Sequence, residues 1–413
     1  MNAVSRAGFR EPFGQRNFRC QWGADLAVSW AFEMENLILG WYVLTATGSV
    51  LWLAAFGALG FAGTLISPLF GVAGDRMGHA RVLAAMRASY LVLACCLAVL
   101  ALAEALSPVL VFALAALTGL VRPSDLGVRN ALIAATMPPP LLASAISIER
   151  VSMDSARVIG ALTGAGLGAL LGIGPVYLVV VALYLFGLGM TRAVREPPHA
   201  AAPGARRGST WHELREGVGY ARAAPGVLAV LWLACLANFA AYPLSGGLLP
   251  HVARDVYGID RTGLGYLVAC FSGGGLAGSL LLTRFGVGAR PGRLLLLGSV
   301  VWFLLLLVFA QVRSPALGML LLAAAGCAQS YSMVPISVLL LRRTATAFRG
   351  RVMGLRMLAI YGLPVGLLAA GPAIARLGFA ATATLYAGFG LACTLAIAWR
   401  WRQALWRADE AGG

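Results

Sequence analysis

Long hydrophobic stretches separated by short polar connections make up most of this chain. They lie at about 18–45, 49–73, 82–104, 108–128, 142–172 and 174–192 and, after a longer polar break, at about 225–250, 262–284, 293–312, 316–341, 351–374 and 379–400. Each stretch is long enough for a helix that crosses a hydrocarbon core about 30 Å thick, which takes about 20 residues. The pattern therefore predicts an all-α membrane protein with about twelve transmembrane helices in two six-helix halves.

The polar break at 193–224 separates the two groups of hydrophobic stretches. Its last part, from Thr210 to Arg222, is typical of a short amphipathic helix, a kind of helix that usually lies in the membrane interface. The apolar side of this helix would carry Trp211, Leu214, Val218 and Ala221. We therefore expect an N-terminal six-helix half at 1–192, a cytoplasmic linker at 193–224 and a C-terminal six-helix half at 225–413.

Composition supports the membrane class. The chain has 413 residues, of which 60% are hydrophobic and 12% charged, and its mean hydropathy is +0.81. A soluble protein of this size could not bury so much apolar surface. The first stretch follows a basic lead and has no small-residue cleavage site, so we expect a retained helix rather than a signal peptide.

The net charge of +16 comes from arginine, because the sequence contains no lysine. Most arginines fall in alternate connections, at Arg6 to Arg19, Arg76 to Arg87, Arg192 to Arg222, Arg284 to Arg293, Arg342 to Arg356 and Arg400 to Arg407. The other connections hold only Arg254, Arg261, Arg313 and Arg376. This asymmetry follows the positive-inside rule and predicts cytoplasmic termini. We expect anionic inner-leaflet lipids, and no nucleic acid, as the partner of these cations.

Acids inside the predicted spans are the first candidates for function, because a charge in hydrocarbon costs at least about 2.5 kcal/mol and needs a reason. All of them lie in the first half, at Asp25, Glu33, Glu35, Asp125, Glu149 and Asp154. Any carboxylate that takes a proton or pairs with a cationic substrate must therefore come from the first half.

The first predicted helix places one row of polar and small residues on a single face, with helical spacing. The row consists of Asp25, Ser29, Glu33, Asn36 and Gly40. Glu35 points about 200° away from Glu33 around the helix. We expect Glu33, nearest mid-span, to exchange a proton for substrate, with Asp25 nearer the cytoplasmic mouth and Glu35 as a further candidate. Alternatively, Glu33 pairs permanently with an arginine and only braces the bundle.

The fifth predicted helix carries Arg150, Asp154 and Arg157 on one face, where opposite charges can support one another. Arg150 and Asp154 are expected to form a local pair. Arg157 should lie near the midplane, where its guanidinium could hold an anionic substrate or Glu33. Glu149 lies off this face, and its role is open.

The second half offers polar but uncharged candidates for substrate binding, namely Asn238, Tyr242 and Gln329. The sequence has no nucleotide-binding loop, and its seven cysteines show no metal-ligand spacing. A nucleophile with a suitably spaced base is also missing. We therefore expect no metal, no cofactor and no enzyme, and a transport process driven by an ion gradient rather than ATP. Apolar walls with aromatics and one or two acids suit an amphipathic organic substrate.

The connection Gly-Val-Ala-Gly-Asp-Arg-Met-Gly-His-Ala-Arg, residues 71–81, joins the second and third predicted helices. It resembles the corresponding loop of major facilitator superfamily transporters, Gly-x-Leu-Ala-Asp-Arg-x-Gly-Arg-Lys. Gly71, Asp75, Arg76 and Gly78 match, and Arg81 keeps a cation one place late. A tight turn would explain the glycines at 71, 74 and 78. We expect this loop to gate transport through a cytoplasmic ion-pair latch with Arg122 and Asp125.

Further motifs resemble the drug and siderophore exporters of that superfamily, which include macrolide efflux and enterobactin export proteins. They are Asn130-Ala131-Leu132-Ile133, Arg157-Val158-Ile159-Gly160, Leu248-Leu249-Pro250 and Arg349-Gly350-Arg351-Val352-Met353. The run Gly160 to Gly168 also resembles the exporters' antiport motif, with Ala161 in place of its proline. The resemblance implies a monomeric, proton-coupled exporter of an amphipathic compound in a bacterial inner membrane. The alternatives are a nutrient importer and a membrane receptor that transports nothing.

Overall fold

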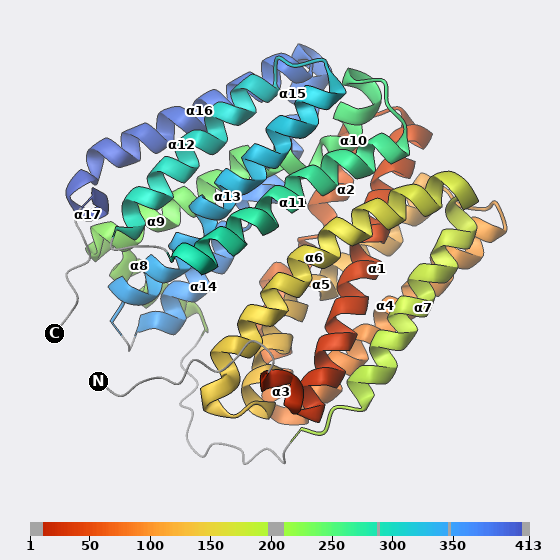
Figure 1. Ribbon diagram of the computed structural model, residues 1–413, viewed down its shortest axis with the longest axis horizontal. Coiled ribbons are helices and arrows are strands. Elements are labelled where there is room, and N and C mark those ends of the chain that lie inside the picture. The colour runs from red at the N-terminus through yellow and green to blue at the C-terminus, as the bar shows by residue number, and fades with distance from the viewer. Residues whose placement is uncertain (1–10, 197–209, 287–289, 346–347, 407–413) are drawn as a thin grey trace. The chain divides into compact units, whose positions relative to one another are not determined.

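The computed structural model describes residues 11–196, 210–286, 290–345 and 348–406 (Figure 1). This part of the chain is helical throughout and contains no strand. The helices of the first part are η1 (Glu11–Gly14), α1 (Arg16–Thr47), α2 (Val50–Leu59), η2 (Ala62–Ile66), α3 (Ser67–Met77), α4 (His79–Leu102), α5 (Pro108–Thr136), α6 (Pro139–Leu171) and α7 (Ile173–Arg192). Those that follow are α8 (Thr210–Ala223), α9 (Pro225–Leu236), α10 (Leu249–His251), α11 (Arg261–Phe285), α12 (Pro291–Phe309), α13 (Pro315–Arg343), α14 (Arg349–Ala359), α15 (Gly362–Leu377), α16 (Phe379–Arg400) and α17 (Arg402–Trp406).

The predicted fold class, an all-α membrane protein, is confirmed. Nine helical stretches of the described chain are long and apolar enough to cross a membrane, and the bent pair Val50–Thr64 and Leu69–Met77 brings the number to ten. Two further helices are long enough to span, α1 with 32 residues and α6 with 33. Both carry the acids and arginines described below, which lower their hydropathy. With α1 and α6 included, the structure agrees with the prediction of about twelve transmembrane helices.

Proline and glycine mark the ends of many of these helices. Prolines begin α5, α6, α9, α12 and α13, at a position where the missing N–H is not needed. Gly48, with φ 63°, ends α1, and Gly378, with φ 79°, lies between α15 and α16. These left-handed conformations suit glycine because it has no Cβ. The polar connections predicted from the sequence are therefore short turns that need little more than these residues.

Three spans that the hydrophobic pattern predicts as continuous are interrupted. After α9, the seventh span continues as π-helical turns at Ala237–Ala241, Pro243–Gly247 and Val252–Val256. Pro243 and Pro250 lack the N–H that a regular helix needs, which explains why the turns widen there. The second span is divided among α2, η2 and α3, and the eleventh between α14 and α15.

The chain forms two compact units. Unit 1 comprises 1–48, 59–203 and 261–265, and unit 2 comprises 49–58, 204–260 and 266–413. In unit 1, α1 packs along both α6 and α7, and α4 packs along α7 and α5 (Figure 1). This arrangement places the polar face of α1 against other helices of the same unit.

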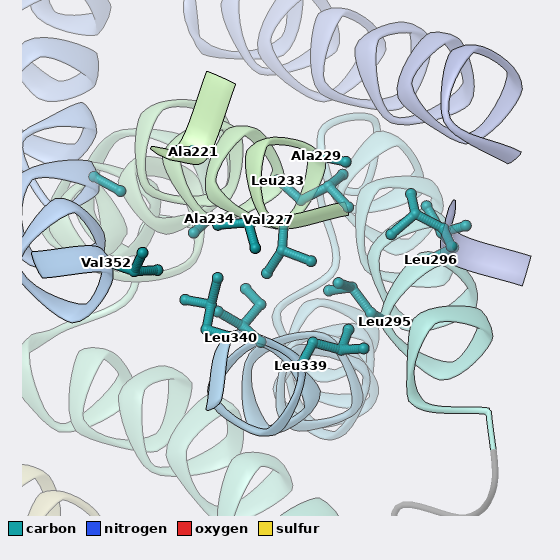
Figure 2. Packing of buried hydrophobic residues seen from close by; sticks show 14 residues of the cluster. Ala221, Val227, Ala229, Leu233, Ala234, Leu295, Leu296, Leu339, Leu340 and Val352 are labelled. Atoms are coloured by element: carbon teal, nitrogen blue, oxygen red, sulfur yellow. The ribbon is translucent and has the colours of Figure 1, made fainter. Parts of the chain in front are cut away.

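The core of unit 2 is assembled from aliphatic side chains of α8, α9, α12, α13 and α14. Figure 2 shows Val227 of α9, Leu295 of α12 and Leu340 of α13 pointing toward one another. The predicted amphipathic helix is α8, and its Ala221 is 3% exposed within this core. The side chains of Trp211 and Leu214 lie outside the described residues. Burial in this cluster ties α8 to the transmembrane helices of unit 2.

Candidate functional site

Close packing of α1 on α6 brings Glu33 to Arg157. A Cβ on Gly160 would lie 2.7 Å from Glu33 Cβ, and one on Gly164 would lie 2.9 Å from Met34 Cα, so only glycine allows this approach. Arg157 Nε donates a hydrogen bond of 3.3 Å to Glu33 Oε1. The side chains are 19% exposed for Glu33 and 40% for Arg157. The sequence left open whether Arg157 holds an anionic substrate or Glu33, and in this structure it contacts Glu33.

The ion pair is part of a longer row of alternating charges along α6. Arg157 Nη1 lies 3.7 Å from Asp154 Oδ1, and Arg150 Nε lies 3.3 Å from Asp154 Oδ2. The helical spacing predicted these two contacts, because residues three and four apart are neighbours on a helix. We call Arg150, Asp154, Arg157 and Glu33 the charged row. In this row, Asp154 contacts both arginines, and Arg157 contacts both acids.

The other residues of α1 separate by helix face as predicted. Asn36, one turn beyond Glu33, is exposed, whereas Glu35 is buried. The Tyr184 hydroxyl on α7 donates a hydrogen bond of 2.9 Å to Glu35 Oε2. Arg122 of α5 lies with its guanidinium carbon 3.5 Å from the centre of the Phe32 ring. The structure therefore places Glu35 on a different face of α1 from Asn36, in contact with α7.

Asp25 occupies a second, fully buried group of charges. Its Oδ1 forms an ion pair with Arg87 of α4, which also donates a hydrogen bond to Thr191, and lies 3.4 Å from Arg129 Nε of α5. Arg129 Nη2 lies 2.5 Å from Asp125 Oδ2, and its Nη1 lies 3.7 Å from Glu149 Oε1. We call Asp25, Arg87, Asp125, Arg129 and Glu149 the buried charge cluster. The five side chains come from four helices, and three of them, Asp25, Asp125 and Glu149, contact the guanidinium of Arg129.

Sequence reasoning missed Arg87 as a partner of Asp25. Arg87 had been assigned to a cytoplasmic connection, whereas α4 extends through it and buries it completely. The available signal was spacing, because Leu83, Arg87, Tyr90 and Ala94 recur at helical intervals and all four are buried. An arginine within an apolar helix face signals a buried acid on a neighbouring helix.

The connection at 71–81 differs from the expected tight turn. Gly71 and Gly74 lie inside α3, which runs to Met77, so Gly78 alone takes the turn, with φ 94°. A Cβ on Gly74 would lie 2.7 Å from the ring of His79, which explains the small residue there. The prediction of a turn at three glycines was wrong, because Gly71 and Gly74 lie inside α3.

Glu196, a residue that the sequence analysis left in the linker, holds the beginning of α4. His79 Nδ1 lies 3.0 Å from Glu196 Oε1, and the Ala80 N–H donates to Glu196 Oε2 over 2.9 Å. Burial alone would raise the pKa of Glu196, but the hydrogen bonds from Ala80 and His79 lower it below its usual value. A cavity of about 590 Å³ beside this acid is lined by Arg76, Arg81, Arg192 and Arg195.

The expected latch residues lie in separate groups in this structure. Asp75, on the exposed side of α3, lies 3.6 Å from His79. Asp125 belongs to the buried charge cluster, and Arg122 lies over Phe32. The ion pairs described for Asp75 and Asp125 therefore go to different partners.

In unit 2, the polar candidates are uncharged and partly paired. Gln329 Nε2 donates a hydrogen bond of 2.7 Å to the Tyr242 hydroxyl, and the Tyr242 ring meets Trp302 edge-on at 5.2 Å. Asn238 donates to the carbonyl of Ala234 within its own helix. The described residues contain no group of three or more His, Cys, Asp or Glu side chains that could hold a metal ion.

Comparison with solved structures shows the fold. The nucleoside transporter NupG (D323A mutant) matches with a TM-score of 0.73 at 15% identity, over 92% of this chain and 98% of that one. The POT family transporter PepTSo gives a TM-score of 0.74 at 14% identity, over 94% of this chain and 98% of that one. The human organic anion transporter MFSD10 gives 0.63 at 18% identity, over 92% and 99%.

No curated protein sequence matches this chain. A protein-family comparison does, however, assign most of it. The model described as Major Facilitator Superfamily matches residues 26–367, from the middle of α1 into α15. The match includes the charged row, the connection at 71–81 and the buried charge cluster apart from Asp25, which precedes it by one residue. The chain therefore belongs to the Major Facilitator Superfamily.

Proposed function

We propose that this protein exports an amphipathic small molecule, of the drug or siderophore kind, in exchange for protons. Membership of the superfamily makes it a multi-pass membrane transporter of the secondary type, which binds a small-molecule substrate. The observation that carries the finer proposal is the ion pair between Glu33 and Arg157. It joins two transmembrane helices and is partly exposed, so its groups are accessible to a proton and to a substrate.

The proposed exchange uses the two states of Glu33. When Glu33 is ionised, it neutralises Arg157 or a cationic group of the substrate. When Glu33 takes a proton, Arg157 loses its partner and turns to Asp154 or to an anionic group of the substrate. Proton and substrate therefore compete for one carboxylate. This competition couples the two movements when the protein alternates between two conformations.

Other residues are proposed to complete substrate binding. Asn36 offers an exposed amide one turn from Glu33, and Asp25 holds the cytoplasmic end of the same helix face. Glu35 braces α1 against α7 through Tyr184. Unit 2 supplies uncharged hydrogen-bonding groups at Asn238, Tyr242 and Gln329.

Gating is proposed to involve the residues at 71–81 together with α5. Gly71, Asp75, Arg76, Gly78 and Arg81 match or approximate the superfamily loop. Arg122 and Asp125 lie one turn apart on α5. We propose that these two groups exchange partners between conformations, while 1–192 and 225–413 act as the moving halves and 193–224 as their cytoplasmic linker.

The membrane setting is proposed from the arginine distribution. Arginine-rich connections would face the cytoplasm of a bacterial inner membrane and bind anionic lipid headgroups, with both termini on that side. The protein is proposed to act as a monomer. Residue accessibility to an impermeant thiol reagent, with single cysteines placed in opposite connections, tests this orientation directly.

The test of export measures accumulation of a panel of fluorescent amphipathic compounds in cells that express the chain. We expect lower accumulation with the wild type, and restoration of normal accumulation by a protonophore and by Glu33→Gln. The matched control is Glu35→Gln, which alters the neighbouring acid on the other face of α1 and should retain export.

Three outcomes decide among the candidate functions. Higher accumulation with the wild type would replace export by import, as for a nutrient transporter. Lower accumulation that survives Glu33→Gln would remove Glu33 from the coupling. No response to any compound, followed by unchanged siderophore secretion, would contradict export of this substrate class and leave the receptor as the alternative.

A further inference from the structure

Glu149 of α6 is the least satisfied acid of the buried charge cluster. The residue is 3% exposed, and among the described residues no N–H or O–H group donates a hydrogen bond to either of its carboxyl oxygens. Its cation neighbour, Arg129 Nη1, is 3.7 Å away, beyond hydrogen-bonding distance. An ionised carboxylate in such a place would lack the hydrogen bonds that buried charges require.

Asp25 has a matching deficiency. Its Oδ1 binds Arg87 and Arg129, whereas no donor from the described part of the chain reaches its buried Oδ2. Both acids lie against the same guanidinium, because Asp25 Oδ1 is 3.4 Å from Arg129 Nε and Glu149 Oε1 is 3.7 Å from Arg129 Nη1. Two ionised carboxylates beside one arginine repel each other, and their oxygens can only accept hydrogen bonds. A single proton between them turns the repulsion into a hydrogen bond.

The buried charge cluster also carries one negative charge too many if all of its acids are ionised. In the buried charge cluster, the acids Asp25, Asp125 and Glu149 outnumber the arginines Arg87 and Arg129 by one. Including the adjacent Glu35 and Arg122 adds one charge of each sign and leaves the excess unchanged. An uncompensated buried charge costs several kcal/mol. A neutral form of one carboxyl removes that cost.

We propose that Asp25 and Glu149 share one proton, which is carried by Glu149 and donated to Oδ2 of Asp25. The cluster is then electrically neutral. Asp25 remains the counter-ion of the two arginines, because both contact its other oxygen. The protonation site differs from Glu33, which has Arg157 as its partner, and it does not depend on the substrate or on the direction of transport.

Among the described residues, the contacts around Glu149 involve no cation beyond those already counted. On α1, Asp25 and Gln21 contact Arg129, and the Gln21 amide donates to the Arg129 carbonyl over 3.0 Å. On the other helices, Arg87 of α4 pairs with Asp25 and donates to Thr191 of α7, Arg129 of α5 contacts Asp125 and Glu149, and Arg122 of α5 lies over Phe32. On α6 itself, the neighbouring Arg150 is directed to Asp154.

An apolar cluster lies beside the pair. Ile148, the residue before Glu149, packs with Phe18 of α1 and Ile133 of α5. Phe13 of η1 covers this group, with its ring centre 5.2 Å from that of Phe18 and 5.1 Å from that of Trp22. Such a covering keeps water from the carboxyl and thereby favours the proton-bearing form.

Infrared spectroscopy of the purified protein in lipid nanodiscs tests the proposal without any transport measurement. At neutral pH we expect a C=O band of a buried protonated carboxyl that shifts in D₂O and disappears at high pH. Glu149→Gln should abolish the band. Asp25→Asn should also abolish it, because Glu149 then ionises as the counter-ion of Arg129. Glu33→Gln and Asp154→Asn, which change acids of the charged row, should leave the band in place.

Thermal unfolding of the same variants gives a second measurement. Glu149→Gln resembles the protonated acid, so its unfolding temperature at neutral pH should equal that of the wild type. A wild type without the band, a band that persists in Glu149→Gln, or a lowered unfolding temperature of Glu149→Gln would each overturn the proposal. The last result would mean that an ionised Glu149 neutralises Arg129.

Discussion

The charged row and the buried charge cluster use the same kinds of side chain, and both include acids of α1 and α6, but they differ in exposure. Arg157 of the charged row is 40% exposed, whereas Arg129 of the buried charge cluster is 1% exposed. A half-exposed ion pair is worth about 1 kcal/mol or less because water replaces either partner. A buried arginine contacts several acids that have no other solvation. Breaking a contact of the charged row should therefore cost less free energy than breaking one of the buried charge cluster.

Replacing each arginine by methionine breaks this comparison most directly. Arg129→Met leaves Asp25, Asp125 and Glu149 with too little positive charge, so we expect a loss of about 3–5 kcal/mol in the free energy of unfolding. Arg157→Met should cost about 1 kcal/mol or less, since its partners are partly solvated. Chemical unfolding in mixed micelles, followed by tryptophan fluorescence, measures both.

Transport should respond in the opposite order once the amount of folded protein is taken into account. Arg157→Met is expected to reach the membrane at the wild-type level and to lose coupled transport. If Arg129→Met and Arg157→Met lower the free energy of unfolding equally, burial does not strengthen the contacts of Arg129, which would contradict the prediction.

The close contact of α6 glycines with α1 lies beside Glu33 of the charged row, so changing a glycine there should affect the charged row more than the buried charge cluster. Gly164→Leu would insert a side chain where a Cβ alone comes within 2.9 Å of Met34 Cα. We expect a loss of about 1–3 kcal/mol from overpacking, and a weakened Glu33–Arg157 pair. The matched control is Gly166→Leu on the same helix, where nothing lies within 4 Å of an added Cβ.

Cysteine cross-linking between α1 and α6 in the two variants measures the separation of the helices. Reduced cross-linking in Gly164→Leu, with normal cross-linking in Gly166→Leu, is the expected result. Equal cross-linking would mean that the helices tolerate the added side chain and that the glycine does not set the distance from Glu33 to Arg157.

Much of this site follows from local spacing. The row Asp25, Ser29 and Glu33 does lie along one side of α1, where Arg129 contacts the first two and Arg157 the third. The pairs within α6 also follow from helical periodicity. Hydrophobic patterning predicted the fold class, since long apolar helices dominate the composition.

What the sequence could not predict depends on contacts between distant residues. Arg87 reaches Asp25 across 62 positions of the chain, and spacing within one helix says nothing about which neighbour a long side chain meets. Glu196 was assigned to a linker because it precedes two prolines, although its carboxylate caps the beginning of α4. The widened turns after α9 were missed because hydropathy does not register a lost backbone donor.

Glu196, which pairs with His79, lies outside the transmembrane helices, so its ionisation can be changed through the pH of the solution. Because hydrogen bonds hold the pKa of Glu196 below its ordinary value in the folded protein, its ionised form favours folding. This contribution is present above the ordinary pKa and is lost as the pH falls through the lowered one. After screening by solvent, we expect it to be below about 1 kcal/mol.

Glu196→Gln should therefore unfold at a slightly lower temperature than the wild type at neutral pH, and the difference should vanish in acid. Thermal unfolding across the acidic range measures this difference. A difference that persists unchanged at low pH would show that Glu196 acts through its shape rather than its charge.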